Sequence, residues 1–314
     1  MTWPLRAAVS ALARDLPAVL ALAFAFAPAA HADYEKGIAA LQRRDAATAF
    51  KELRAAAESG DERAFAPLAT LYGQGAGTKR DIETAKRWAA KAAAKGDANG
   101  QFTLYALIVS SPALNFIDAQ GRVDGERYRV LAKRPITERE DEMTAYDNLG
   151  KAAQQGHRDA SLSLAGFYAD NVGEGNRARA GAILDKLPQR PPLYDGLRKR
   201  LGELDALGPT LLTVRLAEEA IPAAAKVALA AAAEKDKSKG DCAAVKPART
   251  QRMGGVTRPI WLPLAVPEMK TAYLMSGEWR ERWTFDVCGA ESVVHVVFTA
   301  DGLGGATYAV EKER

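Results

Sequence analysis

Helical periodicity repeats through the first half of the chain. Three segments align without gaps and each ends in glycine: 53–60, 89–96 and 149–156. After each glycine, small or apolar residues recur at four-residue spacing, which places them on one face of a helix. These positions are Ala64, Leu68 and Tyr72; Gly100, Leu104 and Ile108; and Ala160, Leu164 and Tyr168. The pattern predicts helix pairs that bury their apolar stripes by stacking on neighbouring pairs.

The spacing between the repeat glycines is uneven. Gly60 and Gly96 lie one repeat length apart, whereas Gly156 follows after a longer interval. The surplus falls within 110–135, a segment rich in residues that favour turns. Such an insertion forms either part of a binding surface or an ordinary surface loop, and both interpretations stay open. A capping box at 137–140 then predicts the start of a further helix.

Beyond residue 191 the chain stays helical but loses the repeated pattern. We expect helices over 193–207, 210–220 and 223–235, the last of which begins after a proline. These helices would cap the array, because an end repeat needs one polar outer face.

Near the C-terminus the periodicity changes from helical to alternating. One face of the segment 279–287 carries Trp279, Glu281, Trp283, Phe285 and Val287. This alternation predicts a half-buried strand. Further strands are expected over 292–299 and 306–311, which gives a small three-stranded antiparallel sheet. The segment 267–276 would cover one face of that sheet.

The chain is therefore predicted to be mostly α, with four parts. A sorting segment covers 1–32, and an α-solenoid with capping helices covers 33–237. A charged stretch with proline and glycine over 238–258 would form a linker. A small β module over 259–314 would follow it.

The first segment has the three-part pattern of a secretory signal peptide. Arg6 and Arg14 supply positive charge, an apolar run covers 16–27, and small residues at Ala30 and Ala32 predict cleavage after Ala32. The apolar run is shorter than the roughly 20 residues of a membrane span, although an uncleaved anchor is the alternative. The mature protein is expected to be periplasmic or secreted, without a transmembrane anchor.

Export changes how the two cysteines are interpreted. Cys242 and Cys288 are the chain's two cysteines, and in an oxidising compartment two such cysteines usually pair. We predict a disulfide between them, with two unpaired structural thiols as the alternative. The formal net charge of +4 is small for 314 residues, so it gives no case for a nucleic-acid partner.

Candidate chemistry is sparse along the chain. His157 and His295 have no partners at zinc-site spacing, so no metal site and no cofactor is predicted. The glycines at 73–77 follow a helix rather than a strand, which favours a repeat turn over a phosphate-binding loop. Trp279 and Trp283 are either an aromatic platform for a ligand or, as we prefer, part of the small sheet's core. No catalytic residue is predicted.

One segment carries a family resemblance. The segment 64–96 contains Tyr72, a Gly-Ala-Gly turn at 75–77, Asp81, Ala85, Trp88, a Lys-Ala-Ala run at 91–93 and Gly96. It resembles the Sel1-like repeat, a relative of the tetratricopeptide repeat, although Thr84 stands where the pattern prefers lysine. The resemblance is weaker over 33–60 and over 160–187, and it covers about half of the predicted mature chain.

The resemblance implies a scaffold that binds a peptide or protein on the face lined by the first helix of each pair. The matching positions here are Phe65, Gln101 and Ser161, with Tyr105 one turn further on. The alternative is that the two aromatic side chains pack between helices.

The predicted function is a non-catalytic exported scaffold or adaptor. One alternative is a cell-envelope hydrolase like the β-lactamase-like Sel1 proteins, but those carry a cysteine pair in each repeat and this chain carries none there. Another alternative is a purely structural envelope module that docks through its β module.

Overall fold

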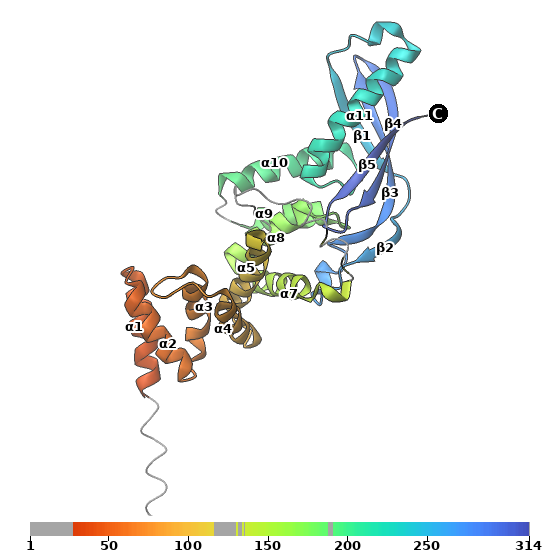
Figure 1. Ribbon diagram of the computed structural model, residues 1–314. Helices are drawn as coiled ribbons and strands as arrows, with labels where there is room; N and C mark the ends of the chain where they lie inside the picture. Colours follow the sequence, from red (N-terminus) through yellow and green to blue (C-terminus); the bar gives the residue numbers. More distant parts are fainter. Residues whose placement is uncertain (1–27, 116–129, 131–133, 135, 188–190, 314) are drawn as a thin grey trace, which may run out of the picture. The chain divides into compact units, whose positions relative to one another are not determined.

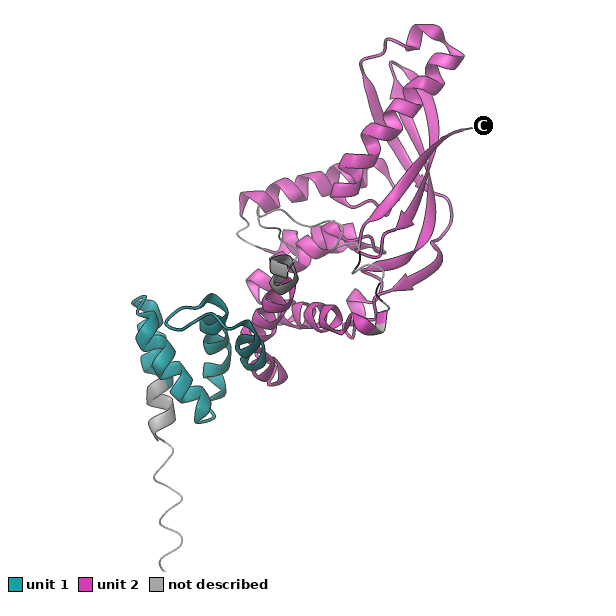
Figure 2. Cartoon of the chain, in the orientation of Figure 1, with its two compact units in different colours: residues 1–88 teal, residues 89–314 magenta. Residues whose placement is uncertain are grey.

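The computed structural model describes residues 28–115, 130, 134, 136–187 and 191–313. Most of the predicted signal peptide, 1–32, lies outside the described residues, and so does most of the predicted insert, 110–135. The chain divides into two compact units, which meet in sequence between Trp88 and Ala89 (Figure 2). Among the helices in the described ranges, none combines the length and the apolar character that crossing a membrane requires.

The first unit is made of short helices that follow the repeat pattern (Figure 1). They are α1 Pro28–Gln42, α2 Ala46–Glu58, the 3-10 turn η1 Glu62–Ala64, α3 Phe65–Gln74 and the first half of α4 Ile82–Ala94. Leu53 and Leu68 are completely buried, and the ring of Tyr72 packs edge-on against Phe50 at 5.1 Å between centroids. The repeated apolar positions therefore form a core between the helices of this unit, as their spacing predicts.

The second unit begins with further helices that pack in chain order. They are α5 Ala98–Asn115, η2 Ile136–Glu138, α7 Glu140–Gln154, α8 Arg158–Asp170, α9 Asn176–Lys186 and α10 Pro192–Leu207. Helix α7 packs against both α5 and α8, and α8 packs against α9. Consecutive contact of this kind is the arrangement that a helical repeat predicts.

Helix α7 begins two residues later than the capping box predicts. Its N-cap is Arg139 rather than residue 137. The Arg139 guanidinium is buried, and it donates hydrogen bonds to the Glu142 carboxylate and, at 2.7 Å, to the carbonyl of Gly302. This long-range contact, 163 residues apart in the chain, cannot be deduced from a local capping pattern.

Two predicted helices are one. Helix α11 runs continuously over Val214–Lys235 and contains Pro222, so the expected break between 220 and 223 is absent. Proline removes one backbone hydrogen bond from a helix. Alanines on both sides of it, at positions 220, 224, 228 and 232, are buried, and α11 packs on the sheet. This burial holds the helix together through the proline, because tertiary packing rather than propensity dominates helix stability.

The sheet is antiparallel and has five strands rather than the predicted three. The strands are β1 Val245–Arg252, β2 Thr257–Trp261, β3 Leu274–Val287, β4 Ala290–Ala300 and β5 Ala306–Lys312, with the turn η4 Pro267–Met269 before β3. Their order is β1-β3-β4-β5, and β2 pairs with the first part of β3 while β1 pairs with its second part. Part of the predicted cover, 274–276, belongs to β3 itself.

The two missed strands lie in segments where proline and glycine mask the strand pattern. The register of β1 shifts next to Pro247, and that of β2 shifts between Thr257 and Ile260, on either side of Pro259. Edge strands and bulges are the positions where a sheet tolerates proline. Most of their side chains are also exposed, so no apolar alternation marks these strands.

Hydrogen bonds join the helices of the second unit to its sheet. The amide of Val172, in the α8–α9 loop, donates to the Gly304 carbonyl at 2.6 Å, and the Leu274 amide donates to the Val172 carbonyl at 2.9 Å. The hydroxyl of Ser292 on β4 donates to the Ala228 carbonyl of α11 at 2.8 Å. The sheet and these helices therefore share one core.

The predicted disulfide is confirmed. Cys242 and Cys288 are bonded, with their Cα atoms 6.0 Å apart. The bridge ties the segment before β1 to the turn between β3 and β4, so it closes a loop that contains β1, β2 and β3.

Candidate functional site

The residues proposed from the resemblance do not form one exposed patch. Phe65 is buried in the first unit, and its ring lies 5.3 Å from that of Trp88. Gln101 is buried in the second unit, where its side-chain oxygen accepts a hydrogen bond from Gln155 at 2.8 Å. Both side chains are therefore engaged inside their own units.

Tyr105 and Ser161 are half-buried. The ring of Tyr105 lies 6.0 Å from Phe102 and 6.4 Å from Tyr146, and burial raises the pKa of its hydroxyl. Ser161 donates its hydroxyl hydrogen to the His157 carbonyl one helical turn back. A role for these residues in partner binding stays a prediction.

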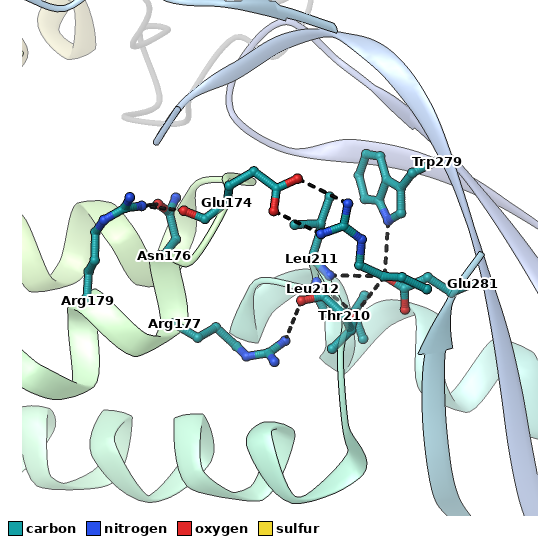
Figure 3. Close-up of polar contacts among 10 residues, drawn as sticks. Glu174, Asn176, Arg177, Arg179, Thr210, Leu211, Leu212, Trp279 and Glu281 are labelled. Carbon is teal, nitrogen blue, oxygen red and sulfur yellow. Dashed lines mark hydrogen bonds and ion pairs between the residues drawn. The ribbon is translucent and has the colours of Figure 1, made fainter. Parts of the chain in front are cut away.

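A pocket of about 110 Å³ lies elsewhere in the second unit. Its walls are the end of α8, the α8–α9 loop, the first turn of α9 and the α10–α11 connection. Tyr168, Arg177, Asp205 and Thr210 contribute to the lining. Figure 3 shows the polar contacts around it. Segments far apart in the sequence thus meet at one small cavity.

Two glycines give the α8–α9 loop its course. Gly175 has a φ of 71°, in the left-handed region that glycine adopts without strain. A Cβ atom on Gly173 would come within 2.7 Å of the Ala272 carbonyl oxygen, so the loop passes too close to that segment for a side chain. The buried amide of Asn176 then donates to the carbonyls of Asn171 and Ala272, both at 2.7 Å. The Gly-x-Gly turn therefore has a fixed shape.

The charged side chains at the pocket are largely paired with one another. Arg177 donates to the Asp205 carboxylate at 2.9 Å and to the Thr210 carbonyl at 3.1 Å. Arg252, on β1, makes a bidentate contact with Glu174 at 2.9 and 3.1 Å, a strong geometry for this pair. These pairs hold the α10–α11 connection and the α8–α9 loop in place.

Arg179 adds a positive charge at the same turn. Its guanidinium donates to the Asn176 side-chain oxygen at 3.2 Å and to the backbone carbonyl of Glu174 (Figure 3). It also lies over the ring of Tyr168, 5.7 Å from the centroid. Its hydrogen bonds thus go to neutral oxygens, whereas Arg177 and Arg252 each bond a carboxylate.

Tyr168 is 3% exposed, and its hydroxyl has no hydrogen-bond partner in the part of the chain that the structure describes. Burial raises the pKa of this hydroxyl to about 12, with Arg179 acting against the shift and Glu268 adding to it. The hydroxyl is therefore protonated at neutral pH and can donate a hydrogen bond into the pocket.

A buried carboxylate supports the pocket from the sheet side. Glu281, on β3, is 0% exposed. One of its oxygens accepts from the Thr210 hydroxyl at 2.8 Å, the Leu211 amide at 3.0 Å and the Trp279 indole at 3.1 Å. The other accepts from the Trp283 indole at 2.9 Å. Glu281 thereby fixes Thr210 and Leu211, which line the pocket (Figure 3).

The residues that the structure describes contain no group of three or more His, Cys, Asp or Glu side chains that could hold a metal ion. His157 instead caps helix α8 by accepting from the Ala160 amide, and His295 lies half-buried on β4.

Sequence reasoning missed this pocket as a site, although it found several of its parts. The repeat pattern predicts Tyr168 on the apolar stripe, and the alternation places Glu281 on the face with the two tryptophans. Arg177 and Asp205 gave no signal, because their contact joins α9 to α10 across 28 residues.

Comparisons with known proteins give little more. No protein-family model matches the chain, and no curated protein matches it. Among solved structures, it is similar to a Sel1 repeat protein from Oxalobacter formigenes, at 21% sequence identity and a TM-score of 0.32. The match covers 54% of this chain and 55% of that protein, so the chain spans about half of its length. At this TM-score, the likeness says nothing about function.

Proposed function

We propose that the protein is an exported, non-catalytic scaffold that binds a peptide or protein partner on the second unit, around the pocket at the start of α9. One observation carries the proposal. The charged side chains of the pocket are paired with each other, while its unpaired side chain, Tyr168, is a neutral hydrogen-bond donor. Such an arrangement favours recognition of a ligand over chemical change.

Acid–base catalysis would need a different electrostatic setting. A general base works best when its pKa lies near the working pH. The pKa of Tyr168 is about 12, and the Asp205 carboxylate accepts from Arg177. Tyr168 is thus not set up to exchange protons with a substrate near neutral pH, and Asp205 is engaged by Arg177.

Export is supported by two independent features. The N-terminal segment 1–32 has the pattern of a signal peptide. The Cys242–Cys288 disulfide is of the kind that persists in oxidising compartments.

Site-specific photo-crosslinking tests the proposal in the cells that make the protein. A photoreactive residue at Ala178, which is exposed at the start of α9, should give discrete adducts with a partner. The same residue at Lys199, exposed on α10, is the matched control and should give background labelling only. Equal adducts at both positions would refute a partner surface around the pocket.

The same crosslinking experiment also tests the alternative of a purely structural envelope module. A module that docks through its sheet should crosslink from Arg280, which is exposed on the face of β3 opposite the buried tryptophans. The hydrolase alternative is tested by incubating the protein with penicillins and with peptidoglycan fragments. Turnover that Tyr168→Phe or Asp205→Asn abolishes would overturn the non-catalytic proposal.

A further inference from the structure

We propose that the pocket at the start of α9 binds a carboxylate group, carried on the partner or on a small acid. The inference deepens the proposed function and rests on it. It assigns the pocket a ligand chemistry, and four features of the pocket carry it.

The first feature is the exposed start of a helix. Helix α9 has 11 residues, and its N-cap, Gly175, has no side chain to accept from the first amides. The amides of Arg177 and Ala178 have no hydrogen-bond partner among the described residues. Unpaired amides and the helix dipole together favour an anion at such a position.

The second feature is independent of the helix. Tyr168 comes from α8, is almost completely buried, lines the cavity and has no described partner for its hydroxyl. The hydroxyl oxygen is accessible rather than enclosed by protein atoms, so a ligand oxygen in the cavity can accept its hydrogen bond in place of water. A protonated phenol offers a donor, which an oxyanion accepts and a cation does not.

The third feature is the local charge. Asp205, the carboxylate in the lining, is held by Arg177, and Glu174 is held by Arg252. Arg179 is left to contribute a positive charge beside the turn, where its hydrogen bonds go to neutral oxygens. Arg179 therefore favours an anion beside the turn, whereas Asp205 in the lining, Glu281 behind Thr210 and Leu211, and Glu268 near Tyr168 oppose it.

The fourth feature is size. A cavity of about 110 Å³ is small, and a water molecule's share of liquid volume is about 30 Å³. The space suits a group of a few heavy atoms, such as a carboxylate, and excludes a nucleotide or a sugar ring. One carboxylate oxygen would accept from the α9 amides and the other from Tyr168.

A matched pair of probes tests the inference on the whole mature protein. N-acetylalanine carries a carboxylate, and its amide has the same shape without the charge. In an NMR titration at constant ionic strength, the acid should move the amide signals of Arg177 and Ala178 to saturation, and the amide should not. Equal or absent responses to the two probes would overturn the inference.

Two variants test the named side chains. Tyr168→Phe removes one hydrogen bond and should raise the Kd of N-acetylalanine about fivefold. Tyr308→Phe, on β5, is its control and should leave the Kd unchanged, because that hydroxyl bonds to the Glu219 carbonyl instead. An unchanged Kd in Tyr168→Phe would contradict the assigned donor.

Asp205→Asn removes the opposing charge and should lower the Kd of N-acetylalanine severalfold. This variant keeps the inference testable if Tyr168→Phe fails to fold. Asp185→Asn is its control, because Asp185 pairs with Arg198 and does not line the pocket. An unchanged Kd in Asp205→Asn would refute the charge argument.

Partner adducts at Ala178 without any carboxylate binding would refute this inference alone. Carboxylate binding without partner adducts would refute the proposed function alone.

Discussion

Replacing Glu281 should destabilise the second unit more than any exposed substitution on the same strand. Glu281→Ala leaves two indole N–H groups and the Leu211 amide without an acceptor, and none of these donors can turn to water. The Thr210 hydroxyl adds nothing to the loss of stability, because it can rotate. At about 1–2 kcal/mol for each orphaned buried donor, the loss in the free energy of unfolding is about 4 kcal/mol.

Glu281→Gln keeps the volume of the side chain but changes its charge and its hydrogen-bonding groups. Its amide oxygen can accept on the Thr210 side, but its NH₂ group then faces the Trp283 indole, which is itself a donor. One hydrogen bond is lost and two donors oppose each other, so we expect a loss of about 2 kcal/mol. The order of stability should therefore be Glu, then Gln, then Ala.

Urea unfolding followed by tryptophan fluorescence measures these losses. Trp261, Trp279 and Trp283 all lie in the second unit, so they report on it directly. With an m value of about 2.5 kcal/mol per molar urea, the Ala variant should lower the midpoint by about 1.5 M.

Glu278→Gln is the matched control on the exposed face of β3, and it should change stability by less than about 0.5 kcal/mol. A Glu281→Ala variant as stable as this control would refute the assignment of Glu281 as the acceptor that organises the pocket's back wall.

Three further predictions concern other parts of the second unit. Reduction of the Cys242–Cys288 disulfide frees a loop whose ends are 46 residues apart, and the chain-entropy model gives a loss of about 4 kcal/mol in the free energy of unfolding. This loss should appear as a lower urea midpoint when reductant is added, and an unchanged midpoint would contradict it. Arg139→Met removes the donor that bonds the Gly302 carbonyl and the Glu142 carboxylate, so it should lower the free energy of unfolding by about 2–3 kcal/mol. Thermal unfolding checks this against Arg158→Met, a substitution of an exposed arginine, and equal melting temperatures would refute it. The pKa of Tyr168 is raised in the folded state to about 12, so the stability it contributes is present below pH 10, its ordinary pKa, and is lost as the pH rises through about 12. Tyr168→Phe should flatten this alkaline loss in unfolding measurements, and an unchanged pH profile would show that another group causes it.

The helical half was predictable because its information is local. The stripe at Ala64 and Leu68, and its repeat at Ala160 and Leu164, lies on one helical face, and all four residues are buried. The face of β3 that carries Trp279, Glu281 and Trp283 was predictable for the same reason, since alternation alone separates the two sides of a strand.

The rest depends on contacts between distant segments. Alternation placed Glu281 beside the tryptophans, but its acceptor role needs Thr210 and Leu211, about 70 residues earlier in the chain. The break expected at Pro222 follows from local propensity, which burial of α11 on the sheet outweighs. In β1 and β2, proline and exposed side chains remove the local signal, although pairing with β3 still forms both strands.

The pocket exists because the sheet holds both of its loops. Arg252 on β1 holds Glu174 in the α8–α9 loop, and Glu281 on β3 holds Thr210 in the α10–α11 connection. A helical repeat alone would leave these two segments without their partners, and the first turn of α9 would face no second wall. The sheet therefore builds the pocket as much as the helices do. It follows that partner binding should be probed by single surface substitutions in the whole chain, because removal of the sheet would remove the site itself.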